Sequence, residues 1–290
     1  MEITELLIQN GASIHAATSL NQTPLYLATE NGDMITAKLL IERGAFINAV
    51  TNGNVTPLHL VIIKLHYIGL FTRKIWKYVA EFLIKKGASV NATTKDNETP
   101  LHLAVMYGNV DIVKLLVKEG AFVNIAINDN ETPLHLAVYN ENTEIVKLLI
   151  RKGACINAIT HRSETALHYA ACSGNLDVVE LLIQHGAWVD AITKSKMTPL
   201  HFAAYTGNIK TAELLIEKGA SINAFTSDNK TPLHFAIDNK NVETATLLIE
   251  RGASVDAKTN GDLAKIKINP EIVYCISRVE NERFHTSLQN

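Results

Sequence analysis

The stretch Asp96-Asn97-Glu98-Thr99-Pro100-Leu101-His102-Leu103-Ala104 decides the fold of this chain, because it returns along the sequence with a nearly fixed step of 33 residues. The tetrapeptide Thr-Pro-Leu-His within it occurs five times, and two near-copies begin at Thr23 and Thr165. In most copies a Gly-Ala pair follows 21 residues after the threonine, as in Gly120-Ala121. Self-similarity with a period of this size is typical of stacked repeats, each of which packs only on its neighbours.

The residues of one repeat predict two short helices and a hairpin. Thr99 is suited to cap the first helix, and Pro100 to occupy its first position, where a missing backbone N–H costs nothing. Within 110–118 the apolar side chains recur at the spacing of a buried helix face, which predicts the second helix. Gly120 can take the left-handed conformation that closes this helix. Residues 122–130 are then expected to form an extended hairpin that leads to the next repeat.

The combination of Thr-Pro-Leu-His-x-Ala, Ile-Val-x-Leu-Leu and Gly-Ala-x-Val-Asn-Ala resembles the ankyrin repeat family over roughly residues 1 to 260. The resemblance implies an all-α solenoid of stacked helix-turn-helix units with short projecting β-hairpin loops. On this register the chain has a partial repeat, seven repeats and a degenerate end. The partial N-terminal repeat covers 1–19 with a second helix and hairpin only, the seven repeats cover 20–52, 53–95, 96–128, 129–161, 162–194, 195–227 and 228–260, and a degenerate C-terminal capping repeat and tail covers 261–290.

Two departures from regularity are visible. The half-repeat at 1–19 is either a natural cap or the remnant of a longer chain, and its likeness to an internal repeat favours truncation or decay. The repeat 53–95 is ten residues longer than the others, and the extra residues near 63–75 lie between its two helices. We expect this apolar, aromatic and basic insertion to fold back and bury its own apolar side chains. The alternatives are that it contacts a partner through Phe71 and Trp76, or that it contacts a membrane surface.

Composition excludes several classes of protein. The net charge of −2 gives no sign of the basic surface that binds nucleic acid. No apolar run is long enough to span a membrane, and the N-terminus lacks the basic start of a signal peptide. The three cysteines form no even set and indicate free thiols in a reducing compartment. We therefore expect a monomer in the cytoplasm, or in a host cell if the chain is exported.

The recurring histidines are the first candidates for chemistry. They are His59, His102, His135, His168, His201 and His234. Stacked helices lie about 8–10 Å apart, whereas Zn–N bonds are about 2.0–2.1 Å, so no metal site is expected. The resemblance implies instead that these rings bond backbone groups of adjacent repeats. The pair of Cys172 and His168 lacks any sign of a cleft or an oxyanion site, and no phosphate loop or hydrolase motif is present. We expect no enzyme, no cofactor and no small-molecule substrate.

Binding residues are predicted where the repeats differ from one another. The exposed end of the first helix carries Met106, Tyr107, Tyr139 and Tyr205, which are residue types that anchor interfaces. The hairpin tips change from acidic to basic along the chain, with Glu98 and Glu131 followed by Arg162 and Lys196. Large aromatic residues follow the Gly-Ala pair at Phe46, Phe122 and Trp188, and an exposed aromatic row would be a binding feature.

These features predict a non-enzymatic protein–protein interaction scaffold. It would bind a partner protein of unknown identity on the concave face of the first helices and on the hairpin tips, with a preorganised surface that loses little entropy on binding. The alternative is a targeting or regulatory ankyrin segment of a larger enzyme, or of an effector secreted by an intracellular microbe. The half-repeat at 1–19 is the feature that keeps this alternative open.

Overall fold

The computed structural model describes residues 2–67, 70–255 and 257, and the side chains of residues 2 and 70–73 fall outside this description. The described residues form 15 α-helices and no β-strand, as an all-α repeat protein requires. The chain divides into two compact units, Met1–Ala154 and Cys155–Asn290. The degenerate capping repeat expected at 261–290 lies outside the described residues.

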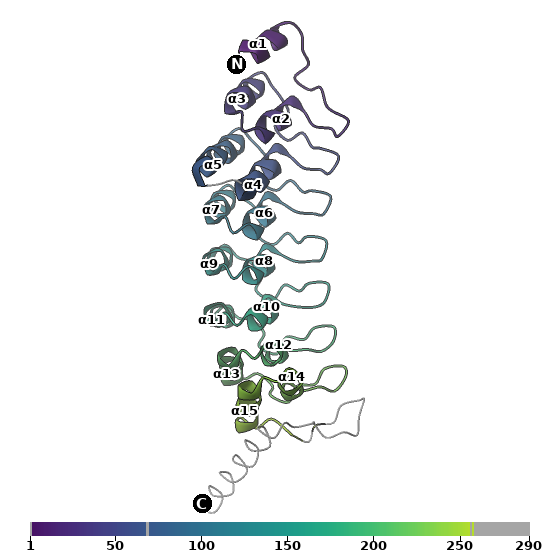
Figure 1. Cartoon of the computed structure of the whole chain (residues 1–290), viewed down its shortest axis with the longest axis vertical. Coiled ribbons are helices and arrows are strands. Elements are labelled where there is room, and N and C mark those ends of the chain that lie inside the picture. The colour runs from purple at the N-terminus through teal and green to yellow at the C-terminus, as the bar shows by residue number, and fades with distance from the viewer. Residues whose placement is uncertain (1, 68–69, 256, 258–290) are drawn as a thin grey trace, which may run out of the picture. The chain divides into compact units, whose positions relative to one another are not determined.

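The first unit consists of a single helix followed by four helix pairs. The single helix is α1 (Glu2–Gln9), and the pairs are α2 (Pro24–Glu30) with α3 (Met34–Glu42), α4 (Pro57–Tyr67) with α5 (Leu70–Lys85), α6 (Pro100–Met106) with α7 (Val110–Lys118), and α8 (Pro133–Tyr139) with α9 (Thr143–Arg151). Within this unit α2, α4, α6 and α8 form one row and the second helices form another, with the loops projecting beyond the first row (Figure 1).

The second unit repeats the pattern in three pairs. These are α10 (Ala166–Ser173) with α11 (Leu176–Gln184), α12 (Pro199–Thr206) with α13 (Ile209–Glu217), and α14 (Pro232–Asp238) with α15 (Val242–Glu250). Its first helices again lie on the side from which the loops project (Figure 1).

The helix ends follow the sequence signals closely. Thr99 has an extended backbone and its hydroxyl accepts the N–H of His102 at 3.4 Å, so it caps α6 as expected. Asn109 caps α7 by accepting the N–H of Ile112 at 3.2 Å. Gly120 has a φ of 87°, which a side chain would strain, and its N–H closes the last turn of α7 on the carbonyl of Val117.

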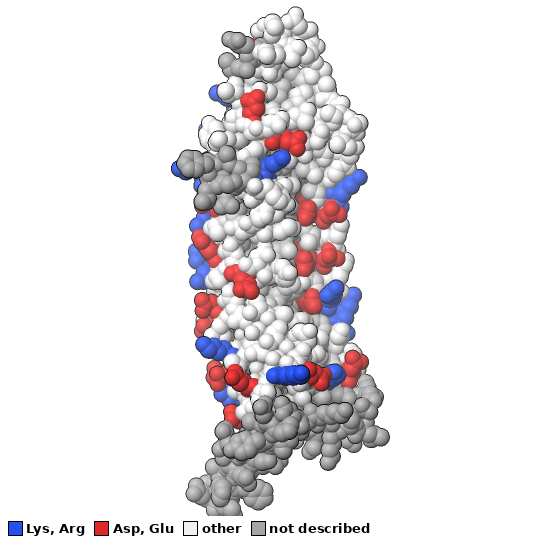
Figure 2. Space-filling model, viewed as in Figure 1, with Lys and Arg blue, Asp and Glu red and all other residues white. Residues whose placement is uncertain are grey.

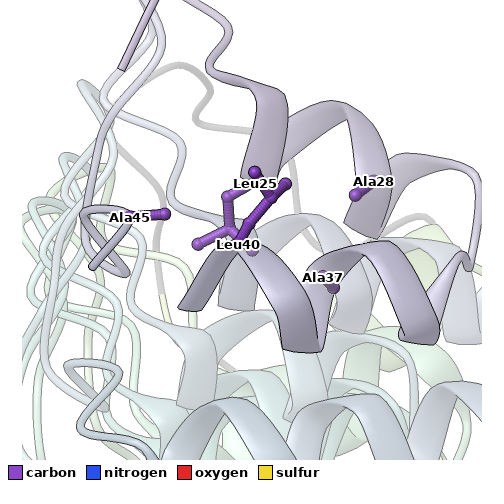
Figure 3. Packing of buried hydrophobic residues seen from close by; sticks show 5 residues of the cluster. All are labelled: Leu25, Ala28, Ala37, Leu40 and Ala45. Carbon is purple, nitrogen blue, oxygen red and sulfur yellow. The ribbon is translucent and has the colours of Figure 1, made fainter. Parts of the chain in front are cut away.

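The core between paired helices is built from leucine and alanine. In the first pair Leu25 and Ala28 of α2 face Ala37 and Leu40 of α3, and each of these side chains is at most 6% exposed (Figure 3). The alanines let the two helices approach, while Leu25 and Leu40 fill the space between the helix ends and the loop that carries Ala45 (Figure 3). Burial of each leucine contributes roughly 1.5–3 kcal/mol.

The loops turn sharply without pairing as strands. In one of them the N–H of Ile127 donates to the carbonyl of Glu131 at 2.9 Å, and Asn130 has a φ of 61°. Asparagine tolerates this left-handed conformation better than most residues. Because the bonded stretch is a single tight turn, the described loops contain none of the β-strand that the term hairpin implies, and that detail of the prediction is corrected.

Asparagine side chains tie neighbouring loops together within each unit. The amide of Asn91 donates to the carbonyl of Gly120 at 3.1 Å, and its oxygen accepts the N–H of Phe122 at 2.8 Å. In the second unit Asn157 makes the same two bonds to Gly186 and Trp188, both at 2.9 Å. Asparagine suits this position because its amide both donates and accepts, so it satisfies two backbone groups at a helix end.

The long repeat departs from this regular plan inside its helices. Helix α4 has 11 residues where α6 has 7, and α5 has 16 where α7 has 9, so the extra residues lengthen both helices. Trp76, which directly follows the extra residues, is only 6% exposed, and its ring lies against Gly32 of the preceding repeat. Leu65 is 1% exposed. The prediction that Trp76 contacts a partner is therefore corrected, because its surface is used in packing.

Candidate functional site

The recurring histidines are parts of the scaffold. The ring Nδ1 of His102 accepts the N–H of Thr99 at 3.1 Å, which leaves Nε2 to donate to the carbonyl of Ile125 at 2.9 Å. His59 reaches the carbonyl of Glu98 in the next repeat at 3.2 Å, and His201 reaches that of Lys230 at 3.2 Å. The prediction that these rings bond backbone groups of adjacent repeats is confirmed for His59 and His201, whereas His102 bonds a carbonyl of its own repeat.

Burial keeps these rings neutral. It lowers the pKa of His59, His102 and His201 to about 4, so they carry no charge near pH 7. The part of the chain that the structure describes holds no group of three or more His, Cys, Asp or Glu side chains that could ligate a metal. The histidines therefore offer neither a general base nor a ligand set.

Cys172 lacks the features of a nucleophile. Partial burial, helped by the nearby carboxylate of Glu164, raises the pKa of its thiol. Reactive cysteines have a lowered pKa, because a positive neighbour or a helix N-terminus stabilises the thiolate. Cys155 of the same unit is exposed. Cys172 is therefore a protonated thiol near pH 7 rather than an activated thiolate.

The ends of the first helices in the first unit form a continuous aromatic surface. We use this term for His66 and Tyr67 of α4, Met106 of α6 with the adjoining Tyr107, and Tyr139 of α8. Tyr67 is 73% exposed, Tyr139 70% and Met106 37%. Asn140, next to Tyr139, donates its amide to the carbonyl of Met106 at 3.0 Å, which holds the end of α8 against the end of α6.

Ring contacts join α4 to α6 in this surface. The rings of His66 and Tyr107 stack with their centroids 4.4 Å apart and an angle of 19° between the planes. Tyr67 meets the edge of Tyr107 at 6.3 Å. Aromatic pairs of this kind hold each other in place, so the half-buried Tyr107 is fixed while much of Tyr67 stays open to a partner.

An acidic side chain borders the aromatic surface. Burial and the charge of Asp96 raise the pKa of Glu98. Burial, followed by the hydroxyl of Tyr67 and the charge of Glu98, raises the pKa of Tyr107. Glu98 is therefore near enough to act on Tyr107, and it is half-buried rather than fully solvated. Glu131, the equivalent residue of the next loop, is likewise half-buried.

Comparison with models of known protein families shows which family the chain belongs to. The family model for ankyrin repeats in three copies matches residues 1–70, 74–160, 123–193, 156–226 and 189–259. The chain belongs to the ankyrin repeat family. Ankyrin repeats are generally protein–protein interaction modules, and the family is typically non-enzymatic. No curated protein matches the chain at a significant level.

The ankyrin repeats of the second unit carry the other predicted residues. Tyr205 stands at the same repeat position as Tyr139 and is 52% exposed. Its ring meets the edge of Phe235 of α14, with the two centroids 6.4 Å apart. Arg162 and Lys196 are exposed at the loop tips, and Trp188 is 62% exposed. Phe46 and Phe122, at the position of Trp188 in loops of the first unit, are 66% and 62% exposed. The aromatic residues after Gly-Ala thus lie on the surface.

Sequence reasoning missed part of the aromatic surface. It predicted Met106, Tyr107 and Tyr139 as binding residues of successive first helices, which stays a prediction, but it assigned His66 and Tyr67 only to an insertion. The signal was the extra length of the first helix, which carries these two rings past the end of a regular helix. The side chain of Phe71 lies outside the described residues. Among the helices that the structure describes, none has the length and apolar character needed to cross a bilayer.

Proposed function

We propose that this ankyrin-repeat protein is a non-enzymatic scaffold that binds a partner protein through the aromatic surface. The observation that carries the proposal is the set of exposed Tyr67, Met106 and Tyr139 at the ends of successive first helices, with Tyr67 packed against the stacked Tyr107. Tyrosine and methionine are enriched in the cores of interfaces, where each buries a large area with few rotatable bonds.

The backbone beneath this surface supports binding because it is already ordered. The side chains stand at the ends of α4, α6 and α8, and hydrogen bonds between repeats hold these ends, such as that from Asn140 to Met106. A partner that docks here orders little of the chain, so more of the contact energy remains as affinity. The half-buried Glu98 at the border favours a partner that presents a basic side chain beside its apolar residues.

The test is capture of partners from cell extract by the immobilised full chain, with bound proteins quantified by mass spectrometry. Replacing Tyr67 and Tyr139 with Ala should lower capture of the specific partner at least about tenfold, since anchor residues contribute roughly 1–3 kcal/mol each. Tyr78→Ala is the matched control, because Tyr78 lies on the second helix α5 and is 60% exposed. Equal capture by the double variant and the control would reject the aromatic surface as the binding site.

A further inference from the structure

A pocket opens between two loops of the second unit, away from the first-helix ends. We call it the loop pocket. Ile159 and Ser163 of one loop and Trp188, Asp190 and Ile192 of the next line it, and its volume is about 490 Å³. The volume is ample for one large apolar side chain of a partner.

The walls of the loop pocket are exposed and apolar. Trp188 is 62% exposed, Ile192 57% and Ile159 45%. One and two repeats before Ile159, the same position in the first unit is occupied by Ala126 and Thr93. The repeat architecture therefore does not require an isoleucine here. Large apolar side chains that gather at the surface mark an interaction site.

Basic side chains surround the outer end of the loop pocket. Arg162, Lys194 and Lys196 are exposed at the two tips, and the N–H of Lys194 donates to the carbonyl of Arg162 at 3.0 Å, which holds the tips together. Figure 2 shows Lys and Arg side chains gathered over the loop edge of this unit. In the first unit the position of Arg162 is occupied by Asp96 and Asp129 instead, although Lys95 stands at the position of Lys194.

The nearby carboxylates offset this positive charge only in part. Both oxygens of Asp190 accept hydrogen bonds from Ser221, from its N–H at 2.9 Å and its hydroxyl at 2.6 Å. Glu164 is half-buried and acts on Cys172 of α10, so it lies toward the first helix. Asp228 stands on the following tip, where the basic stretch ends.

We propose that the loop pocket binds an acidic linear segment of a partner protein, with one large apolar side chain of the segment seated on Trp188 and Ile192. Its carboxylates would pair with Arg162, Lys194 and Lys196 at the tips. The inference rests on the proposed function in taking proteins as partners, but it uses a separate surface. A single-stranded nucleic acid fits less well, because Asp190 and two isoleucines line the space that a phosphate backbone would have to follow.

Trp188 provides a direct readout, since the other tryptophan, Trp76, is buried. The full chain is titrated with a blocked peptide Glu-Asp-Glu-Leu-Phe-Asp-Asp-Glu while tryptophan emission is recorded. Three further probes are a peptide with Lys for every acid, a peptide with Ala for Leu and Phe, and oligothymidylate. Binding of the first peptide should shift the emission to shorter wavelength, and raising the salt concentration should weaken it.

Matched variants use residues that other repeats carry at the same positions. Ile192→Thr copies Thr93, and the double variant Lys194→Ser with Lys196→Asn copies Ser227 and Asn97. Each should weaken the acidic peptide about tenfold, whereas Tyr78→Ala on α5, which belongs to neither surface, should leave its affinity unchanged. The proposal is overturned if the acidic peptide fails to bind, if the lysine peptide or oligothymidylate binds as tightly, or if the alanine peptide or the Ile192→Thr variant shows undiminished binding. The capture experiment changes Tyr67 and Tyr139, whereas this titration changes Ile192, Lys194 and Lys196, so failure of either proposal leaves the other intact.

Discussion

The neighbouring repeats α4–α5 and α6–α7 place different residues at the same point of contact. Counted back from Gly87 and Gly120, Trp76 occupies the place of Asn109. In the next two repeats Asn109 and Asn142 cap the second helix, and Asn142 also lies near the turn glycine of the preceding repeat, 3.6 Å from a side chain built on Gly108. In the long repeat the helix has already begun at Leu70, so no cap is needed and an indole ring fills the space against Gly32.

The comparison shows that an insertion can change a helix cap into a core contact without changing the register of the stack. The lengthened α4 then carries His66 and Tyr67 onto Tyr107, so the same insertion also builds half of the aromatic surface. The residue that follows the insertion thus serves packing, and the residues at its start form part of the proposed binding surface.

The largest expected effect is the loss of the indole. Trp76→Ala should lower the free energy of unfolding of the first unit by about 3–5 kcal/mol, because it opens a cavity at a contact between repeats. Urea unfolding followed by circular dichroism measures the change. Tyr78→Ala, on the exposed side of the same helix, should change it by less than about 0.5 kcal/mol. A small effect of Trp76→Ala would mean that α5 is held by its other residues alone.

The second expectation concerns acid and should apply to both repeats alike. The pKa of His59 and His102 is about 4 in the folded chain, below the ordinary value of 6.5. As the pH falls below 6.5 the unfolded chain takes up these protons first, so stability falls until the pH passes about 4 and then levels off. At pH 5 the loss is about 2 kcal/mol for each histidine. Urea midpoints at pH 7 and pH 5 test this, and His102→Gln should reduce the difference between them. An unchanged difference would remove His102 as its source.

The third expectation concerns the helix cap Asn109, whose place Trp76 takes in the long repeat. Asn109→Ala should cost about 1 kcal/mol, because the N–H of Ile112 loses its cap. Asn109→Asp should cost less, since an aspartate also caps and its charge is favourable at a helix N-terminus. Thermal unfolding of the two variants gives the comparison. If both variants lose the same stability, the NH2 group of Asn109 contributes more to stability than its capping oxygen does.

The smallest expected effect is on the ion pair that joins the compared repeats. Lys77 of α5 donates to the carboxylate of Asp111 of α7 at 2.9 Å, and this contact raises the pKa of Lys77 and lowers that of Asp111. Both side chains are largely exposed, so Lys77→Met should cost less than about 1 kcal/mol at low salt and still less at high salt. A loss that does not depend on salt would point to packing by the lysine stem instead.

Much of the fold was predictable because each repeat carries the same residues at the positions where its helices begin and end. The N-cap threonines, the proline at the first helical position and the closing glycines all follow from the recurring residues around Thr99 and Gly120. The backbone role of the histidines was implied by the resemblance to ankyrin repeats. The position of Met106, Tyr107 and Tyr139 at one face follows from the same register.

The packing of Trp76 and the stacking of His66 could not be predicted, because they depend on contacts that the repeat pattern does not determine. Trp76 carries an aromatic side chain in a stretch with basic neighbours, which is equally typical of an exposed binding loop. Only its alignment with Asn109, counted back from Gly87, indicates that it faces the preceding repeat. The stacking of His66 on Tyr107 depends on how far α4 extends, and the length of a helix that continues through an insertion is set by tertiary packing rather than by local signals.

The asparagine bonds between loops have a consequence for how such a gene can change length. Asn91 needs only a glycine carbonyl and one N–H from the repeat that follows, and the regular repeats offer both groups at the same position. A duplication or loss of 33 codons in register would therefore rejoin compatible edges wherever it fell among regular repeats. At the boundary of the long repeat the same event would set Trp76 against the corresponding residue of another repeat. That residue is a glycine at Gly108, Gly174 and Gly207 but Glu141 or Lys240 elsewhere, so only some junctions would leave room for the indole.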